Sequence, residues 1–228
     1  MPTYDCSHAI QPGMSVYPGD DPVRVEETAT IQADGARVHD LGMTTHTGTH
    51  IDAPAHAVAD GPTLDDFDVE AFRFEARVVD CTPCRDRERL TLAVLPEEVR
   101  ANPVEELDML VFRTNWSEYW GTERYRDSPY LGGDLARWCA EAGFHVGLDT
   151  FSPDPVPSAD PSRESAAEPT DLPAHGALCG ADRFVVENLR GLARLPERVE
   201  LATLPLAIAD ADGSPVRAVA HTREQSHI

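Results

Sequence analysis

His46-Thr47-Gly48-Thr49-His50-Ile51-Asp52-Ala53-Pro54-Ala55-His56 is the most informative stretch of the chain. It gathers three histidines and one aspartate into a short segment of a chain that has nine histidines in all. Imidazole nitrogens and carboxylate oxygens are the ligands that zinc and manganese prefer. Three such ligands leave a coordination position open, as catalytic metal sites do. The stretch therefore predicts a metal centre.

The composition of the same stretch indicates a tight loop or a single turn rather than a regular helix. Its threonines are β-branched, Gly48 is a poor helix former, and a proline follows. In an extended segment, His50 and Asp52 point to the same side because side chains alternate. A turn at Gly48 would bring His46 back towards them, so three ligands would converge without a distant partner.

The rest of the sequence predicts one mixed α/β domain over residues 1–228. Hydrophobic residues make up 41% of the chain, which is enough for a core. Residues 152–173 are dense in Pro, Ser, Asp and Glu and predict a long surface loop, either mobile or functional, and residues 221–228 predict a flexible tail. Strands are expected at 23–31, 38–45, 74–80, 108–113, 144–148, 184–187, 204–209 and 216–220, and helices at 95–101 and 131–142.

The charge balance limits the partners of this chain. Nineteen arginines, with no lysine, oppose forty acidic residues and give a net charge of −21. Such a surface repels nucleic acids and anionic membranes, so neither partner is expected. The acidity fits solubility in a salty, halophilic cytoplasm, and an acidic interaction face is the alternative. No apolar run approaches the ~20 residues of a membrane span and no signal peptide is evident, so we expect a cytoplasmic protein.

The five cysteines suit a reducing compartment, because their number is odd and their spacing shows no disulfide framework. Cys81-Thr-Pro-Cys84 has the spacing of a redox motif, but it stands alone. It also follows a predicted strand, whereas a thioredoxin-like motif should open a helix. Buried or half-buried thiols are therefore the expected interpretation.

The histidine-rich stretch resembles the H-x-G-T-H-x-D-x-P-x-H signature of the cyclase family, whose best-known members are bacterial kynurenine formamidases, or arylformamidases, of tryptophan catabolism. The resemblance covers nearly the whole chain. Arg113-Thr-Asn-Trp116 is similar to the family's R-x-x-W segment, residues 147–154 to its G-x-D-x-x-S-x-D segment, and residues 213–217 to its C-terminal ending.

The resemblance also implies a ligand set, a fold and an assembly. A family histidine followed twelve positions later by a glutamate matches His175 and Glu187. One metal would be held by His46, His50 and Asp52. The opposite side would be lined by His56, His175 and Glu187, as ligands of a second metal or as acid–base groups. The implied metal is Zn²⁺, one or two per chain, with Mn²⁺ as an alternative. The implied fold is a swivelling β/β/α domain with a mixed sheet or small barrel flanked by helices, in homodimers or larger homo-oligomers.

The function implied by the resemblance is a metal-dependent hydrolase that cleaves the C–N bond of a small amide, with an N-formylkynurenine-like aryl formamide as the leading substrate. His56 and Glu187 are candidates for deprotonating water and protonating the leaving nitrogen. One alternative is an isatin-hydrolase-like enzyme that opens a cyclic amide or lactone at the same site. Another is a non-catalytic metal-binding protein, which would need a closed set of four ligands.

An aryl substrate needs an apolar wall, and several aromatic residues could supply it. The candidates are Tyr17, Trp116 and Phe151, with Tyr119 and Trp120 nearby in the sequence. Core packing is the alternative for each of them, because aromatic side chains dominate cores. Residues 152–173 run up to His175 and could act as a lid over the substrate.

Overall fold

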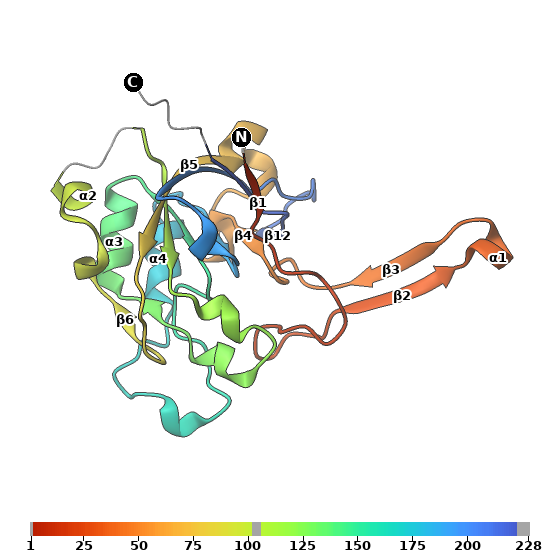
Figure 1. Cartoon of the computed structure of the whole chain (residues 1–228), viewed down its shortest axis with the longest axis horizontal. Coiled ribbons are helices and arrows are strands. Elements are labelled where there is room, and N and C mark those ends of the chain that lie inside the picture. The colour runs from red at the N-terminus through yellow and green to blue at the C-terminus, as the bar shows by residue number, and fades with distance from the viewer. Residues whose placement is uncertain (1, 102–105, 223–228) are drawn as a thin grey trace.

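The computed structural model describes residues 2–101 and 106–222 and contains a nine-stranded mixed sheet (Figure 1). The strand order is β1-β13-β11-β5-β7-β9-β10-β4-β12. The strands of this sheet are β1 (Thr3–Asp5), β4 (His50–Asp52), β5 (Arg73–Asp80), β7 (Met109–Arg113), β9 (His145–Leu148), β10 (Val185–Glu187), β11 (Arg198–Ala202), β12 (Gly213–Pro215) and β13 (Val219–His221). A separate pair joins β6 (Arg89–Leu90) to β8 (Tyr130–Leu131).

The central strands β5, β7, β9 and β10 run parallel, and antiparallel strands flank them on both sides. β4 lies between β10 and β12 and is antiparallel to both. Sites in α/β sheets form at the carboxyl ends of parallel strands, where the pairing pattern changes. The ends of β9 and β10 and the start of β4 meet at such an edge.

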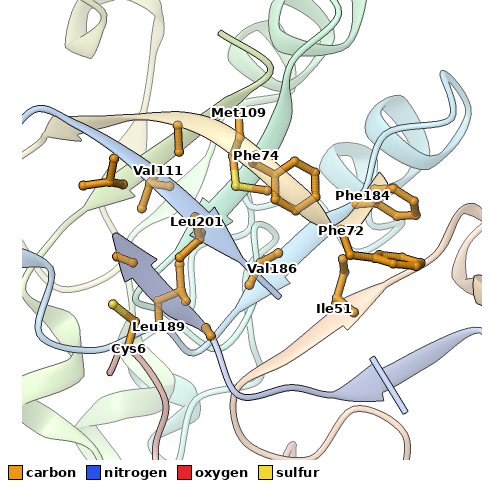
Figure 2. Packing of buried hydrophobic residues seen from close by; sticks show 14 of the residues in the cluster. Cys6, Ile51, Phe72, Phe74, Met109, Val111, Phe184, Val186, Leu189 and Leu201 are labelled. Carbon is orange, nitrogen blue, oxygen red and sulfur yellow. The ribbon is translucent and has the colours of Figure 1, made fainter. Parts of the chain in front are cut away.

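The two faces of the sheet bury different cores. In β7, Leu110 and Phe112 pack with the helices, whereas Met109 and Val111 belong to the core on the other face (Figure 2). This alternation follows from the two-residue period of a strand. The covering helices are α2 (Glu97–Ala101), α3 (Gly133–Glu141) and α4 (Pro173–Cys179). Short 3₁₀ turns occur at Pro54–His56, Leu64–Asp66, Val69–Phe72, Leu92–Val94, Trp116–Tyr119, Glu123–Asp127, Pro161–Arg163 and Leu192–Arg194.

A hairpin arm projects from this body (Figure 1). It consists of β2 (Arg24–Ala29), the short helix α1 (Ile31–Asp34) and β3 (Val38–Gly42). No residue of these three elements is buried. Ile31, Val38 and Leu41 are 60%, 49% and 59% exposed. The arm therefore presents apolar side chains that the body of the same chain does not cover.

Most of the predicted elements are confirmed, including the mixed α/β class and the helices near residues 97–101 and 133–141. The predicted strand at 204–209 is wrong, because this segment is irregular apart from a single bridge between Pro205 and Val216. Its alternating apolar residues Leu204, Leu206 and Ile208 are exposed instead of packed. The strand predicted at 216–220 is shifted, because β13 spans Val219–His221.

The loop predicted at 152–173 lies only partly at the surface. Ser152 and Asp154 are buried, and Arg87 forms an ion pair with Glu168 that ties the loop to the body. Pro173 is the first residue of α4, so His175 belongs to a helix. Of the predicted tail, His221 lies in β13, and residues 223–228 lie outside the described residues.

The predicted thiols are free, and burial raises the pKa of Cys84 to about 12. Within the described residues, no helix combines the length and the apolar character needed to cross a membrane.

Candidate metal centre

Strand pairing positions the first part of the site. His50 and Asp52 are 2% and 0% exposed and share one face of β4. The register of β4 against β10 sets His50 opposite Glu187. As a result, His50 Nε2 lies 3.2 Å from Asp52 Oδ1 and 3.2 Å from Glu187 Oε2.

The predicted turn before β4 is present and brings His46 back to Asp52. Gly48 has φ +65°, a conformation that glycine adopts readily. Its carbonyl oxygen accepts hydrogen bonds from His50 Nδ1 (2.8 Å) and Asn188 Nδ2 (2.9 Å). His46 Nδ1 consequently lies 2.7 Å from Asp52 Oδ1.

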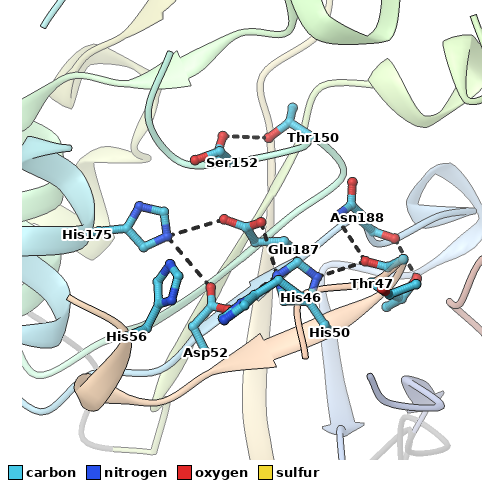
Figure 3. A network of polar contacts seen from close by, with 12 residues as sticks. His46, Thr47, His50, Asp52, His56, Thr150, Ser152, His175, Glu187 and Asn188 are labelled. Carbon is cyan, nitrogen blue, oxygen red and sulfur yellow. Dashed lines mark hydrogen bonds and ion pairs between the residues drawn. The ribbon is translucent and has the colours of Figure 1, made fainter. Parts of the chain in front are cut away.

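The start of α4 positions His175, and Asp154 fixes it there. The carboxylate of Asp154 accepts three hydrogen bonds. They come from the backbone N–H groups of Ala174 (2.8 Å) and His175 (3.0 Å) and from His175 Nδ1 (2.8 Å). The other ring nitrogen, Nε2, then lies 3.3 Å from Glu187 Oε1 and 3.7 Å from Asp52 Oδ2 (Figure 3).

His56 and Asp212 complete the cluster at its partly exposed side. The ring of His56 lies 4.0 Å from that of His46 and 5.2 Å from that of His175, between centroids. Asp212 Oδ2 lies 2.9 Å from His46 Nε2 and 3.4 Å from His56 Nδ1. The sequence alone does not single out Asp212, because Ala-Asp-Gly is an ordinary turn sequence. The only available signal was its place directly before the segment 213–217.

Opposite charges balance inside the cluster. Burial opposes the charge on His50, but Asp52 and Glu187 outweigh it and raise the pKa of His50 well above its usual value. His175 behaves in the same way, with Asp154 as the largest favourable contribution to its raised pKa. Burial also opposes the charge on Asp52, yet the neighbouring imidazoles hold its pKa well below the usual value.

The residues fit a divalent metal ion. Asp52 Oδ2, His175 Nε2 and Glu187 Oε1 are buried and have no hydrogen-bond partner in the described part of the chain, although buried polar atoms normally have one. Ligand atoms lie within 4.8 Å of one another in the groups His46/His50/Asp52, Asp52/His175/Glu187 and His46/His56/Asp212. The first two groups share Asp52, so they could hold one ion or two neighbouring ions.

A cavity of about 220 Å³ opens onto this cluster. Of the aromatic residues predicted to contact substrate, Tyr17 and Phe151 line it, with ring centroids 6.4 Å apart in an edge-to-face arrangement. Trp116 lies behind this wall: it is 2% exposed and its Nε1 donates a hydrogen bond to the Tyr125 carbonyl (3.2 Å). The full lining is Tyr17, Asp20, His46, His50, His56, Phe151, Ser152, Leu172, His175, Glu187 and Asn188.

Residues 4–155 match the Cyclase family. The kynurenine formamidase of Salinibacter ruber is 35% identical over 226 residues, which cover 96% of this chain and 97% of the relative. The chain belongs to the cyclase family. This confirms the family predicted from the histidine-rich stretch.

Solved structures agree with this assignment. Isatin hydrolase A from Labrenzia aggregata, bound to benzyl benzoate, aligns with this cyclase-family chain at a TM-score of 0.84 and 26% identity, covering 98% of this chain and 94% of that one. A potential metal-dependent hydrolase with cyclase activity aligns at a TM-score of 0.74 and 26% identity, covering 98% of both chains. The fold of the cyclase-family chain is therefore the mixed α/β fold of these hydrolases.

Proposed function

We propose that this chain is a metal-dependent hydrolase that cleaves the C–N bond of a small aryl formamide, with an N-formylkynurenine-like compound as substrate. The observation that carries the proposal is the buried group Asp52, His175 and Glu187 beside a cavity with an aromatic wall. The 35% identity to a kynurenine formamidase over nearly the whole chain supports a formamide as the substrate class.

His46, His50 and Asp52 would hold the first ion, and Asp52, His175 and Glu187 the second where two ions bind. These donors suit Zn²⁺, with Mn²⁺ as the alternative. A bound divalent ion lowers the pKa of water and polarises a carbonyl oxygen. The outer ring nitrogens of the ligating histidines are already hydrogen bonded, so the imidazoles are oriented before an ion arrives.

Formamide hydrolysis adds water to the formyl carbon, breaks the C–N bond and protonates the departing amine. His56 and Glu187 both line the cavity and are placed to move these protons. Glu187 would accept the proton of water if it remains outside the coordination shell. His56, whose side chain is 28% exposed, would deliver a proton to the leaving nitrogen at the cavity side.

Tyr17 and Phe151 would contact the aryl ring of the substrate, at two walls of the cavity. Leu172, near the end of the loop 152–173, also lines the cavity. We propose that this last part of the loop closes over the bound ring, because it is the part of the loop adjacent to α4 and His175.

The test is His50→Ala with His39→Ala on the exposed arm as the control. We expect the His50 variant to lose metal, measured by mass spectrometry, and to lose turnover of aryl formamides while its circular dichroism is unchanged. Full turnover with lowered metal content would refute the catalytic assignment. Wild-type protein that binds metal but cleaves nothing would instead support the metal-binding alternative.

A second substrate class has support of its own, because isatin hydrolases are among the structural neighbours. The same site could open a cyclic amide, since the bond broken is again a C–N bond beside a carbonyl group. Turnover of isatin and of small lactones, compared with formanilides on the same preparation, separates the two.

We also propose that the chain works in the cytoplasm as a homodimer or larger homo-oligomer. Five free cysteines fit a reducing compartment. An isolated two-stranded hairpin is marginally stable in water, and the arm exposes Ile31, Val38 and Leu41. A second copy of this chain is the partner that would cover them.

A further inference from the structure

Each of the three proposed ligating imidazoles has one ring nitrogen facing Asp52 and the other held by an oxygen of a different residue. His50 Nδ1 donates to the Gly48 carbonyl, and His175 Nδ1 donates to Asp154. His46 has its Nδ1 at Asp52 and its Nε2 at Asp212, 2.9 Å away. Asp212 therefore occupies, for His46, the place that Asp154 occupies for His175.

Asp212 differs from Asp154 because a second imidazole shares the same oxygen atom. Asp212 Oδ2 is also 3.4 Å from His56 Nδ1, and Oδ1 accepts a hydrogen bond from Thr45 Oγ1 (3.1 Å). The backbone is fixed as well, because the Ala53 N–H donates to the Asp212 carbonyl (2.8 Å). The carboxylate is thus tied to both ends of the histidine-rich stretch.

We infer that Asp212 is a positioning residue that orients His46 towards the metal and holds His56 at the cavity. The inference rests on the proposed function for the role of His56. Asp212 is not itself required as a ligand, because the nitrogen of His46 that faces Asp52 is Nδ1 and the one that faces Asp212 is Nε2. Oxygen partners of ligating histidines typically change metal affinity about 10- to 100-fold when removed.

The experiment compares Asp212→Asn and Asp212→Ala with the neighbouring control Asp210→Asn, whose backbone φ of +55° asparagine tolerates. Zinc affinity is measured by chelator competition and zinc content at saturation by mass spectrometry. We expect affinity to fall about 10- to 100-fold for alanine, less for asparagine because its oxygen can still accept from Nε2, and not at all for the control.

Steady-state kinetics with a formanilide as substrate separate the effect of each variant on kcat from its effect on KM. We expect kcat to fall and KM to stay, because Asp212 does not line the cavity. Unchanged affinity and kcat in both Asp212 variants would overturn the inference, and so would loss of one zinc ion at saturation, which would make Asp212 a ligand. If wild-type protein cleaves no formamide, the proposed substrate fails, while the affinity series still tests the orientation of His46.

The turn that carries Tyr17 also brings a carboxyl group to the cavity. Tyr17-Pro18-Gly19-Asp20 forms a tight turn: the Asp20 N–H donates to the Tyr17 carbonyl (3.0 Å) and Gly19 has φ +106°. Both ends of this turn line the cavity. Tyr17 and Asp20 therefore lie close together at the cavity.

Asp20 brings a carboxyl group to the cavity without belonging to the proposed metal centre. Among the described residues, it belongs to none of the groups that could share an ion, and its side chain accepts one hydrogen bond, from Thr44 Oγ1 at 3.4 Å. No arginine is among the described residues that line the cavity, and the chain has no lysine. We propose that Asp20 selects aryl formamides that carry an ammonium group on a substituent of the ring. This proposal rests on the proposed function.

The test uses formanilides that carry an ortho aminoethyl, ethyl or carboxyethyl group. For wild-type protein we expect kcat/KM to be highest for the cationic compound and lowest for the anionic one. Asp20→Asn should reduce the preference for the cation about fivefold through KM, and the exposed neighbour Asp21→Asn should leave it unchanged. Equal preference in wild type and Asp20→Asn would overturn this assignment, whereas absence of all formanilide turnover would count against the proposed function.

Discussion

At the scale of the residue, Asp52 places a carboxyl group in the interior of the protein. It is fully buried, and the ring nitrogens of three histidines approach its two oxygens: His46 and His50 at Oδ1, and His175 at Oδ2. A buried carboxylate is costly unless it is paired or bound to metal. The protein pairs it with imidazoles that a divalent ion can use as ligands once they lose their protons.

Glu187→Gln tests whether the charge of Glu187 is needed for the reaction. We expect the variant to keep one bound ion, because His46, His50 and Asp52 are untouched, and to lose about 10²- to 10⁴-fold in kcat. Steady-state kinetics and metal content are measured together. Unchanged kcat would remove Glu187 from the reaction, and the exposed Glu97→Gln on α2 serves as the control for loss of a glutamate.

The closeness of the His50 and Asp52 side chains could be predicted from the sequence, because both lie on one short strand with a two-residue period. The sequence could not predict Asp212 as a partner of His46. Their contact joins the turn before β4 to the residue directly before β12, so it depends on the pairing of these two strands. The importance of Asp154 was also hidden, because its role depends on where α4 begins. Local patterns indicate candidate ligands, whereas the hydrogen-bond partners of these residues depend on tertiary structure.

At the scale of the element, the predicted strand at 204–209 shows the limit of periodicity. The segment alternates apolar and other residues as a half-buried strand would, at Leu204, Leu206 and Ile208. These side chains are exposed and do not pack against the sheet. The prediction for α3 succeeded because Leu135 and Cys139 are one helical turn apart and are both buried against the sheet. An apolar pattern specifies an element only where a complementary surface exists.

Strand β9 offers a test of stability against pH. His145 accepts a hydrogen bond from the Phe184 N–H at Nδ1 (2.8 Å), and burial lowers the pKa of His145 to about 3. An unfolded chain would protonate this histidine below pH ~6.5. The stabilisation of the folded state by neutral His145 is therefore complete above that pH and is lost as the pH falls towards 3.

His145→Asn keeps an acceptor near the position of Nδ1 and removes the titration. We expect the free energy of unfolding of the wild type to fall more steeply between pH 6.5 and pH 5 than that of the variant, by up to about 1.4 kcal/mol per pH unit. Urea unfolding at several pH values measures both slopes. Parallel curves would show that His145 does not contribute to acid sensitivity.

At the scale of the whole molecule, the arm and the acidic surface act on assembly in opposite directions. A net charge of −21 repels a second copy, and the repulsion weakens as salt screens it. The apolar side chains of the arm favour association. Assembly should therefore strengthen at high salt.

The double variant Val38→Thr and Leu41→Thr tests the arm while placing β-branched residues, which suit a strand, at both positions of β3. We expect it to shift the mass from light scattering towards that of a single chain. The matched control is Val69→Thr with Leu206→Thr, because these side chains are 60% and 51% exposed outside the arm. Equal masses for wild type and the arm variant would exclude the arm as the contact.

The position of β4 in the sheet has a consequence for biosynthesis. Both of its neighbours, β10 and β12, come from the last quarter of the chain. While the ribosome is still translating that part, His50 and Asp52 have no paired strand to hold them, and His175, Glu187 and Asp212 do not yet exist. The candidate group Asp52, His175 and Glu187 can consequently form only after this part of the chain has been translated, whereas His46, His50 and Asp52 are all present much earlier.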